Sequence, residues 1–277
     1  MKKILAVSGG IDSVVMLHMF RDDPDAIVAH FDHGIRPNSR DDCDFVERLA
    51  KSYERPFFVK HARLGANCSE ETARKSRYDF FNQLAAEQSG KIYTAHHRDD
   101  LIESVAINIL RGTGWRGLAP LNNPDIVRPL LSMTKKDIYR YATDHNLTFR
   151  QDQTNFDEIY LRNRVRFVFQ GVPETQKTQL ANLAFRQREL ASEIDTILQK
   201  FNPGANYSRS LFSNDDQIST ELLRFILSQH NVQLTRPQLA RALTAIRSFM
   251  PGKKHSLDKN HFLLINRYYF SITYDKI

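Results

Sequence analysis

The first half of the chain alternates between short apolar runs and longer amphipathic stretches. The apolar runs have the length of buried strands, and the stretches between them carry apolar residues at helical spacing. The predicted strands are residues 4–7, 26–31, 57–59, 92–95 and 126–127, and the predicted helices are residues 14–20, 39–53, 69–88, 99–110 and 134–145. Strands that alternate with helices favour a parallel sheet covered on both faces. We therefore expect a doubly wound α/β domain with a mostly parallel sheet over residues 1–172.

Two of the predicted helices carry N-terminal signals. Ser39 precedes Asp41 and Asp42, so it is a candidate N-cap followed by an acidic first turn. Thr134 and Asp137 have the spacing of a capping box. Both signals predict where a helix begins.

A second pattern begins after Pro173. Apolar residues recur at helical spacing, and the chain closes with two short apolar runs. The predicted elements are helices at residues 174–201, 219–228 and 237–249 and a terminal β-hairpin at residues 262–265 and 268–274. Residues 173–277 are therefore expected to form a smaller helical domain that ends in a β-hairpin.

Charge changes what this second domain is expected to do. The whole chain has a formal net charge of +7. Residues 174–277 hold 14 Lys and Arg against 9 Asp and Glu, a difference of +5. An excess of this kind is typical of a region that binds a polyanion. We expect the second domain to contact nucleic acid.

The sequence also excludes several classes of protein. Cys43 and Cys68 form no CxxC motif and cannot build a disulfide framework or a zinc finger. No apolar stretch approaches the roughly 20 residues of a membrane span, and the N-terminal apolar run ends at glycines instead of a cleavage site. These features predict a cytoplasmic protein with no membrane partner.

A candidate phosphate-binding loop lies between the first predicted strand and the first predicted helix. A helix N-terminus offers N–H groups and partial positive charge to a phosphate, and paired glycines let the backbone approach its oxygens closely. Two serines add hydroxyl donors, and the aspartate is a suitable ligand for Mg²⁺. The plain alternative is a tight turn, because the segment is neither GxxxxGK[ST] nor GxGxxG. The loop consists of Ser8, Gly9, Gly10, Ile11, Asp12 and Ser13.

This loop resembles the SGGxDS signature of the PP-loop ATP pyrophosphatases. The resemblance implies an adenine-nucleotide α-hydrolase-like fold and cleavage of ATP between its α and β phosphates. It also implies ATP and Mg²⁺ as cofactors, with residues 8–13 binding the nucleotide and Asp12 both holding the metal and serving in catalysis. In that superfamily an oxygen of the substrate is adenylated, and a nucleophile then displaces AMP.

Further motifs narrow this resemblance. They are Phe31 to Ser39, then Glu71, Ala73, Arg74, Arg77, Tyr78 and Phe80, then His96 to Ser104, Arg111 to Leu118 and Arg128 to Leu131, and finally Asp152, Thr154, Asn155 and Arg162 to Arg166. In this order they resemble the tRNA(Ile)-lysidine synthetase family over residues 4 to about 170, and more loosely beyond. Ser104 departs from the Thr that is usual there. Many members carry a further C-terminal domain that is not expected in this chain.

The resemblance implies a specific reaction. An ATP-dependent ligase would adenylate the C2 oxygen of the wobble cytidine (position 34) of a tRNA(Ile) with a CAU anticodon. The ε-amine of free L-lysine would then attack C2 and form lysidine. This product changes the codon and the amino-acid specificity of the tRNA from Met to Ile.

Two carboxylates and two histidines match this chemistry. Free lysine is an ammonium with a pKa of about 10.4, so it needs carboxylates to bind it and to accept a proton. Asp100 and Glu103 are spaced to share one helix face, and the resemblance makes them the lysine-binding, catalytic pair. His96 is expected to act in catalysis on the adenylate, and His33 is expected near the nucleotide. An acidic first turn that only complements the helix dipole is the alternative for the carboxylates.

Seven arginines are expected to contact tRNA. Arg74 and Arg77 are suited to holding the target cytosine or its phosphate. The others suit the RNA backbone and the anticodon loop, and they are Arg111, Arg116, Arg162, Arg164 and Arg166. A solvated surface is the alternative interpretation for each of them.

Other functions have less support in the sequence. A zinc site built from His33, His96, His97 and Asp99 lacks an HExxH motif or a cysteine pair. A tRNA 2-thiolation enzyme would need cysteines in suitable motifs, and an amidotransferase would need an N-terminal nucleophilic cysteine and a glutaminase domain. A non-catalytic binding protein is disfavoured because the acidic residues of the reaction are all present.

Overall fold

The structure is a computed structural model that describes residues 1–34, 39–62, 68–150, 161–200, 204–213 and 215–274. The chain divides into two compact units, Met1–Arg188 and Glu189–Ile277. This division falls within one helix, α7 (Glu174–Gln199). The domain boundary predicted at residue 172 lies ahead of that helix, and it remains a prediction about which part of the chain folds independently.

The first unit contains a five-stranded sheet. Its strands are β1 (Lys2–Ala6), β2 (Ala26–Asp32), β3 (Phe57–His61), β4 (Gly90–Tyr93) and β5 (Ile126–Val127). Their order is β3-β2-β1-β4-β5, and every pairing is parallel. Because the order reverses beside β1, the sheet is doubly wound, which confirms the predicted fold class.

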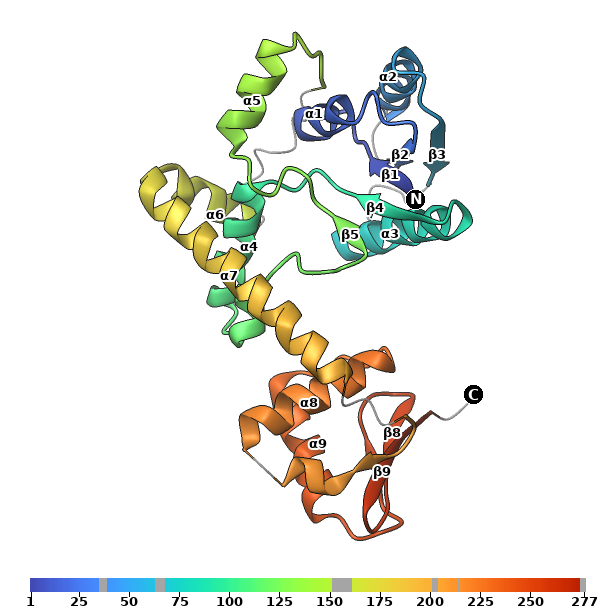
Figure 1. The fold of residues 1–277 in the computed structure, drawn as a ribbon, viewed down its shortest axis with the longest axis vertical. Helices are drawn as coiled ribbons and strands as arrows, with labels where there is room; N and C mark the ends of the chain where they lie inside the picture. The colour runs from blue at the N-terminus through green and yellow to red at the C-terminus, as the bar shows by residue number, and fades with distance from the viewer. Residues whose placement is uncertain (35–38, 63–67, 151–160, 201–203, 214, 275–277) are drawn as a thin grey trace. The chain divides into compact units, whose positions relative to one another are not determined.

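Helices cover both faces of this sheet (Figure 1). Leu5 of β1 faces α1 (Ile11–Met19), α2 (Ser39–Ser52) and α5 (Lys135–Asp144). Its neighbour Ile4 faces the opposite way, toward α3 (Glu70–Glu87). This alternation follows from the two-residue repeat of a strand, and it explains why the strands read as continuous apolar runs.

The helix beginnings agree with the signals in the sequence. Asp41 and Asp42 lie in the first turn of α2, although that helix already includes Ser39. Thr134 caps α5, and the side chain of Asp137 accepts a hydrogen bond from the Thr134 N–H at 3.0 Å. The predicted capping box is therefore confirmed.

A group of helices packs beside the sheet within the first unit. It comprises α4 (Arg98–Leu110), the 3₁₀ helix η1 (Trp115–Leu118), α6 (Leu161–Gln170) and the first part of α7. α6 is not among the helices predicted from the sequence. Leu161, Val165, Val168 and Phe169 have helical spacing, although only Val165 is buried, so an apolar pattern is present that the prediction missed.

The second unit combines two helices with a small antiparallel sheet. The helices are α8 (Asp216–Gln229) and α9 (Arg236–Ser248), with the 3₁₀ helix η3 (Arg209–Phe212). The sheet has the order β6-β9-β8-β7, formed by β6 (Tyr207–Ser208), β9 (Tyr269–Tyr274), β8 (His261–Ile265) and β7 (Lys254–Ser256). The predicted hairpin is β8 and β9, whereas β6 and β7 are too short to leave a pattern. None of the helices described here is long and apolar enough to cross a membrane.

Candidate active site

The predicted phosphate loop joins β1 to α1. Gly9 has a φ of +92°, a conformation that favours glycine. The Ser13 hydroxyl accepts hydrogen bonds from the backbone N–H groups of Ser8 and Gly9, both at 3.1 Å. It also donates to the Gly10 carbonyl at 2.8 Å. The loop is thus held in shape from inside, and Gly10 caps α1 without a side chain that would occupy the free N–H groups.

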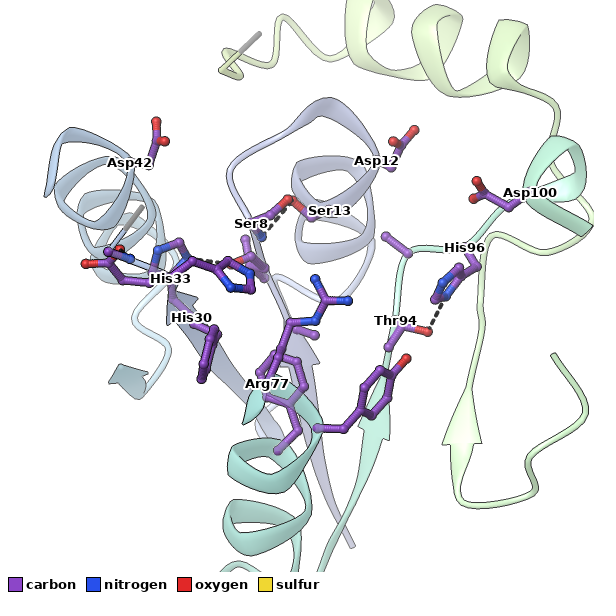
Figure 2. A pocket seen from close by; sticks show the side chains of 18 residues that line it. Ser8, Asp12, Ser13, His30, His33, Asp42, Arg77, Thr94, His96 and Asp100 are labelled. Carbon is purple, nitrogen blue, oxygen red and sulfur yellow. Dashed lines mark hydrogen bonds between the residues drawn. The ribbon is translucent and has the colours of Figure 1, made fainter. Parts of the chain in front are cut away.

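A cavity of about 610 Å³ opens beside this loop. Figure 2 shows Ser8, Ser13, His33, His96 and Arg77 around it, contributed by segments that follow β1, β2 and β4 and by α3. Its volume suits a nucleotide-sized ligand, and its position at the carboxyl ends of the strands is where open parallel sheets bind ligands. Of the residues predicted to bind the nucleotide, Ser8, Asp12, Ser13 and His33 line this cavity, whereas Gly9, Gly10 and Ile11 do not.

A second cavity of about 370 Å³ adjoins the first. Both cavities are lined by Asp12 and Asp100. The second one adds Asp99 and Glu103, together with basic side chains from α5, α6 and α7, which are Lys135, Arg166 and Lys177. The two cavities thus meet at two carboxylates, and around the second cavity the four carboxylates outnumber the three basic side chains.

Asp12 is tied to a residue that the sequence analysis missed. The Lys135 Nζ lies 2.6 Å from Asp12 Oδ1, and His97 Nε2 lies 3.8 Å from the same oxygen. Lys135 is the first residue of α5, and its N–H donates to Asp99 Oδ2 at 3.1 Å. No short motif marks Lys135, because its partner is more than a hundred residues away in the sequence.

The predicted carboxylate pair lies on α4. His97 and Asp100 form a capping box, in which Asp100 Oδ2 accepts the His97 N–H at 3.0 Å. Both side chains of the pair are largely buried, with 13% of Asp100 and 6% of Glu103 exposed. The pair is therefore shielded from water and depends on protein partners for its charge.

Burial and neighbouring charge act differently on the two carboxyl groups. Burial tends to raise the pKa of Asp100, but the charge and backbone N–H of His97, helped by His96 and Arg162, hold that pKa below its usual value. Burial raises the pKa of Glu103, and Arg166 and Arg162 offset only part of the effect. Glu103 is therefore the more basic of the two, which suits it to accepting a proton.

Two of the arginines expected to bind tRNA contact these carboxylates instead of standing free on the surface. Arg166 Nε donates to Glu103 Oε1 at 2.8 Å, and Arg166 Nη2 lies 3.4 Å from Asp100 Oδ1. Arg162 Nε donates to Glu103 Oε2 at 3.2 Å. The two arginines lie four residues apart on α6, so they share one face of that helix.

The other arginines are more dispersed. Arg164 and Arg111 are exposed, and Arg116 stacks its guanidinium 4.8 Å from the Trp115 ring. Arg77 lines the first cavity. Arg74 is exposed on the same helix, with its guanidinium 4.8 Å from the ring of Tyr78.

The two histidines of the predicted site occupy different parts of the first cavity. Thr94 Oγ1 lies 2.9 Å from His96 Nδ1 (Figure 2). Burial lowers the pKa of His96 to about 4, so the ring is neutral at pH 7. His33 follows β2, with its ring 4.8 Å from that of Phe31. In the described part of the chain no three His, Cys, Asp or Glu side chains come together as metal ligands, so the zinc alternative gains no support.

Comparison with known proteins adds a family to this geometry. The tRNA(Ile)-lysidine synthase of Caldanaerobacter subterraneus subsp. tengcongensis is 35% identical over 214 residues, which cover 72% of this chain and 46% of that protein. The tRNA(Ile)-lysidine synthase of Thermosipho africanus is 37% identical over 59% of this chain and 42% of its own length. The bifunctional protein TilS/HprT of Listeria monocytogenes is 37% identical over 60% of this chain and 28% of its length. The matched region thus spans less than half of each relative.

A solved structure shares the fold over about two thirds of this chain. The U34-tRNA thiolase NcsA from Methanococcus maripaludis superposes with a TM-score of 0.57 over 68% of this chain and 72% of that chain, at 18% identity. Residues 1–171 match the family model of the PP-loop domain. This match covers more than half of the chain and includes the phosphate loop of residues 8–13 as well as Asp100 and Glu103. The chain therefore belongs to the PP-loop domain family.

Proposed function

We propose that this protein joins free L-lysine to C2 of the cytidine at wobble position 34 of a tRNA(Ile) with a CAU anticodon, using ATP and passing through an adenylated cytidine. The observation that carries the proposal is that two cavities, one beside the phosphate loop and one lined by carboxylates, meet at Asp12 and Asp100. Two substrates that react in turn with one base need adjoining sites of this kind. Similarity to tRNA(Ile)-lysidine synthases supports the choice of substrates.

In the proposed first step, ATP binds with its phosphates against the loop of residues 8–13. The C2 oxygen of cytidine attacks the α-phosphorus, and pyrophosphate leaves. Loop N–H groups stabilise the charge that develops on the phosphate oxygens. Asp12 fits Mg²⁺, because one carboxylate with phosphate oxygens and water is a usual ligand set, and the ion would neutralise phosphate charge. Lys135, whose Nζ lies 2.6 Å from Asp12 Oδ1, orients the Asp12 carboxylate.

In the proposed second step, lysine occupies the smaller cavity. Its ε-ammonium gives a proton to Glu103, whose pKa is raised by burial. The resulting amine attacks C2, the bond between C2 and oxygen breaks, and AMP leaves with the bonding electrons. Asp100 remains ionised and holds the substrate ammonium groups. The direction of the two pKa shifts therefore supports a division of labour between the carboxylates.

The remaining residues are proposed to position the reactants. His96 is neutral and touches Thr94 through Nδ1, so its Nε2 is available to hydrogen-bond the adenylate. His33 is proposed to contact the nucleotide. Arg162 and Arg166 are proposed to orient the carboxylates, in place of the RNA contact expected from the sequence.

The proposed tRNA contacts lie on both units of the chain. They comprise Arg74 and Arg77 near the target base, Arg111, Arg116 and Arg164 outside the two cavities, and the basic region of residues 173–277. A tRNA substrate and free lysine also make the cytoplasm the expected compartment. Binding should weaken steeply with salt, because contacts to phosphate release counterions.

The test is incorporation of radiolabelled lysine into a tRNA(Ile) transcript with a CAU anticodon in the presence of Mg-ATP. We expect label that requires ATP and that disappears when the wobble cytidine is replaced by uridine. Asp100→Asn should lower incorporation at least a hundredfold, and Asp144→Asn, on the exposed surface of α5, is the matched control. Pyrophosphate release with no lysine incorporation would reject the proposed substrates and leave a different PP-loop reaction.

A further inference from the structure

Arg128 lies at the end of the edge strand β5, close to His96. Tyr93 of β4 is in register with Val127 of β5, and the Thr94 N–H donates to the Val127 carbonyl at 3.0 Å. Arg128 is therefore level with Thr94, roughly one strand spacing of about 4.8 Å away. Because Thr94 also contacts the His96 ring at 2.9 Å, Arg128 leaves β5 beside the strand end that carries His96.

The charge of Arg128 has no acidic partner in the described part of the chain. Its Nη1 donates to the Ile126 carbonyl at 2.9 Å and lies 3.5 Å from the Asn123 carbonyl. Its Nε is buried and makes no hydrogen bond with the described residues. Burial lowers the pKa of Arg128 to about 10, and no carboxylate opposes the effect. A cation in such a place is costly unless an anion joins it.

Two further arginines add to this positive charge. Arg74 and Arg188 are close enough to lower the pKa of Arg128 further, and only Tyr78 opposes them. Arg188 is fixed by a hydrogen bond from its Nη1 to the Pro120 carbonyl at 2.8 Å. The ion pairs of the described residues include neither Arg74 nor Arg128. This set, the Arg74–Arg128–Arg188 cluster, differs from Arg162 and Arg166, whose charge is matched by Glu103.

We propose that Arg74 and Arg128 bind an RNA phosphodiester next to the cytidine that reacts, with Arg188 adding positive charge nearby. This inference rests on the proposed function. A strand phosphate needs a site that opens to solvent, and Arg74 is exposed whereas Arg128 is half-buried. Such a contact carries no sequence information but fixes the register of the strand. It would hold the base so that its C2 oxygen faces the α-phosphate of ATP.

The position of the cluster favours RNA over ATP as the source of the phosphate. β5 is two strands away from β1, which precedes the phosphate loop. At the usual strand spacing this separates the two sites by roughly 10 Å. The phosphates of ATP already have a binding loop with free N–H groups, so the second anion is best supplied by the other substrate.

The experiment measures binding of a short anticodon stem-loop RNA with a CAU loop by fluorescence anisotropy. The variants are Arg128→Gln and Arg74→Gln, and the second is safe for folding because Arg74 is exposed. Arg140→Gln, an exposed arginine paired with Asp137, is the control. We expect each test variant to weaken binding about tenfold, equal to about 1.4 kcal/mol, with a smaller salt dependence.

Neutral methylphosphonate linkages on either side of the wobble cytidine identify the contact. One of them should weaken binding to the unaltered protein about tenfold and should weaken binding to Arg128→Gln little further. The inference would be overturned if the neutral linkage weakened RNA binding equally in the unaltered protein and in Arg128→Gln. It would also be overturned if the variants bound RNA like the unaltered chain. Neither outcome would require lysine incorporation to fail. An Arg128→Gln variant with weakened ATP binding and normal RNA binding would assign the site to the nucleotide. If the unaltered chain neither binds the RNA nor incorporates lysine, the proposed function itself fails.

Discussion

Replacing Arg166 with glutamine tests the electrostatics of the candidate site most directly. Arg166 donates to Glu103 at 2.8 Å, and only 6% of the Glu103 side chain is exposed. Breaking a fully buried ion pair costs about 3–5 kcal/mol, and an exposed pair contributes about 1 kcal/mol at most. Since 35% of Arg166 is exposed and Arg162 still contacts Glu103 at 3.2 Å, we expect a loss of about 2 kcal/mol.

The loss should depend on pH, with a sign fixed by Glu103. Burial already raises the pKa of this carboxyl in the folded protein, so its ionised form costs stability. Arg166→Gln raises the pKa of Glu103 further, because one of the two cations that oppose the effect of burial is removed. The cost is complete above the raised folded pKa and vanishes below the unfolded pKa of about 4.3. The variant should therefore be closer to the unaltered protein at pH 4.5 than at pH 8.

Urea unfolding followed by tryptophan fluorescence measures this effect. The chain has one tryptophan, Trp115, which lies in η1 beside α4 and reports on the first unit. A double-mutant cycle with Glu103→Gln should give a coupling energy of at least about 1 kcal/mol at pH 8. Arg140→Gln serves as the surface control. Equal losses at both pH values, or additive effects in the cycle, would refute the role assigned to Arg166.

Three other predictions follow from the same geometry. Gly9→Ala should cost about 1–2 kcal/mol in urea unfolding and weaken ATP binding, because φ is +92° there, whereas Gly10→Ala, with φ of −72°, should not be strained. Lys135→Gln should lower the rate of pyrophosphate release about tenfold while the thermal unfolding midpoint changes little, because Asp12 loses its partner at 2.6 Å. In an NMR titration His96 should stay neutral down to about pH 4, and stability should fall as pH drops from about 6.5 toward that value; a midpoint near 6.5 would contradict its burial.

The sequence predicted the parts of the fold that depend on local pattern. The five strands and the capping box of Thr134 leave signals within a few residues, and the structure confirms both. The site residues that follow strand ends could also be predicted from the sequence, because parallel strands bring their carboxyl ends to one edge of the sheet. Ser8, His33 and His96 accordingly line one cavity, although they are far apart in the sequence.

The charge partners of the arginines could not be predicted in the same way. Arg162, Arg164 and Arg166 form one basic run in the sequence, which favoured a common role in binding RNA. The helix α6 divides them, because side chains four residues apart share a face and the one between them does not. Glu103, which meets Arg162 and Arg166, lies about 60 residues away, too far for any local pattern to indicate the contact.

This division also explains why Arg128 stands apart from the arginines of α6. A guanidinium that meets a buried carboxylate serves to hold that carboxylate, as Arg166 holds Glu103. A guanidinium that is desolvated without an acidic partner has charge left for a ligand, as Arg128 does. The two situations cannot be distinguished by residue type or by spacing, since burial and long-range contacts decide between them. The same type of side chain thus holds a buried carboxylate at Arg166 and is proposed to bind a phosphate at Arg128.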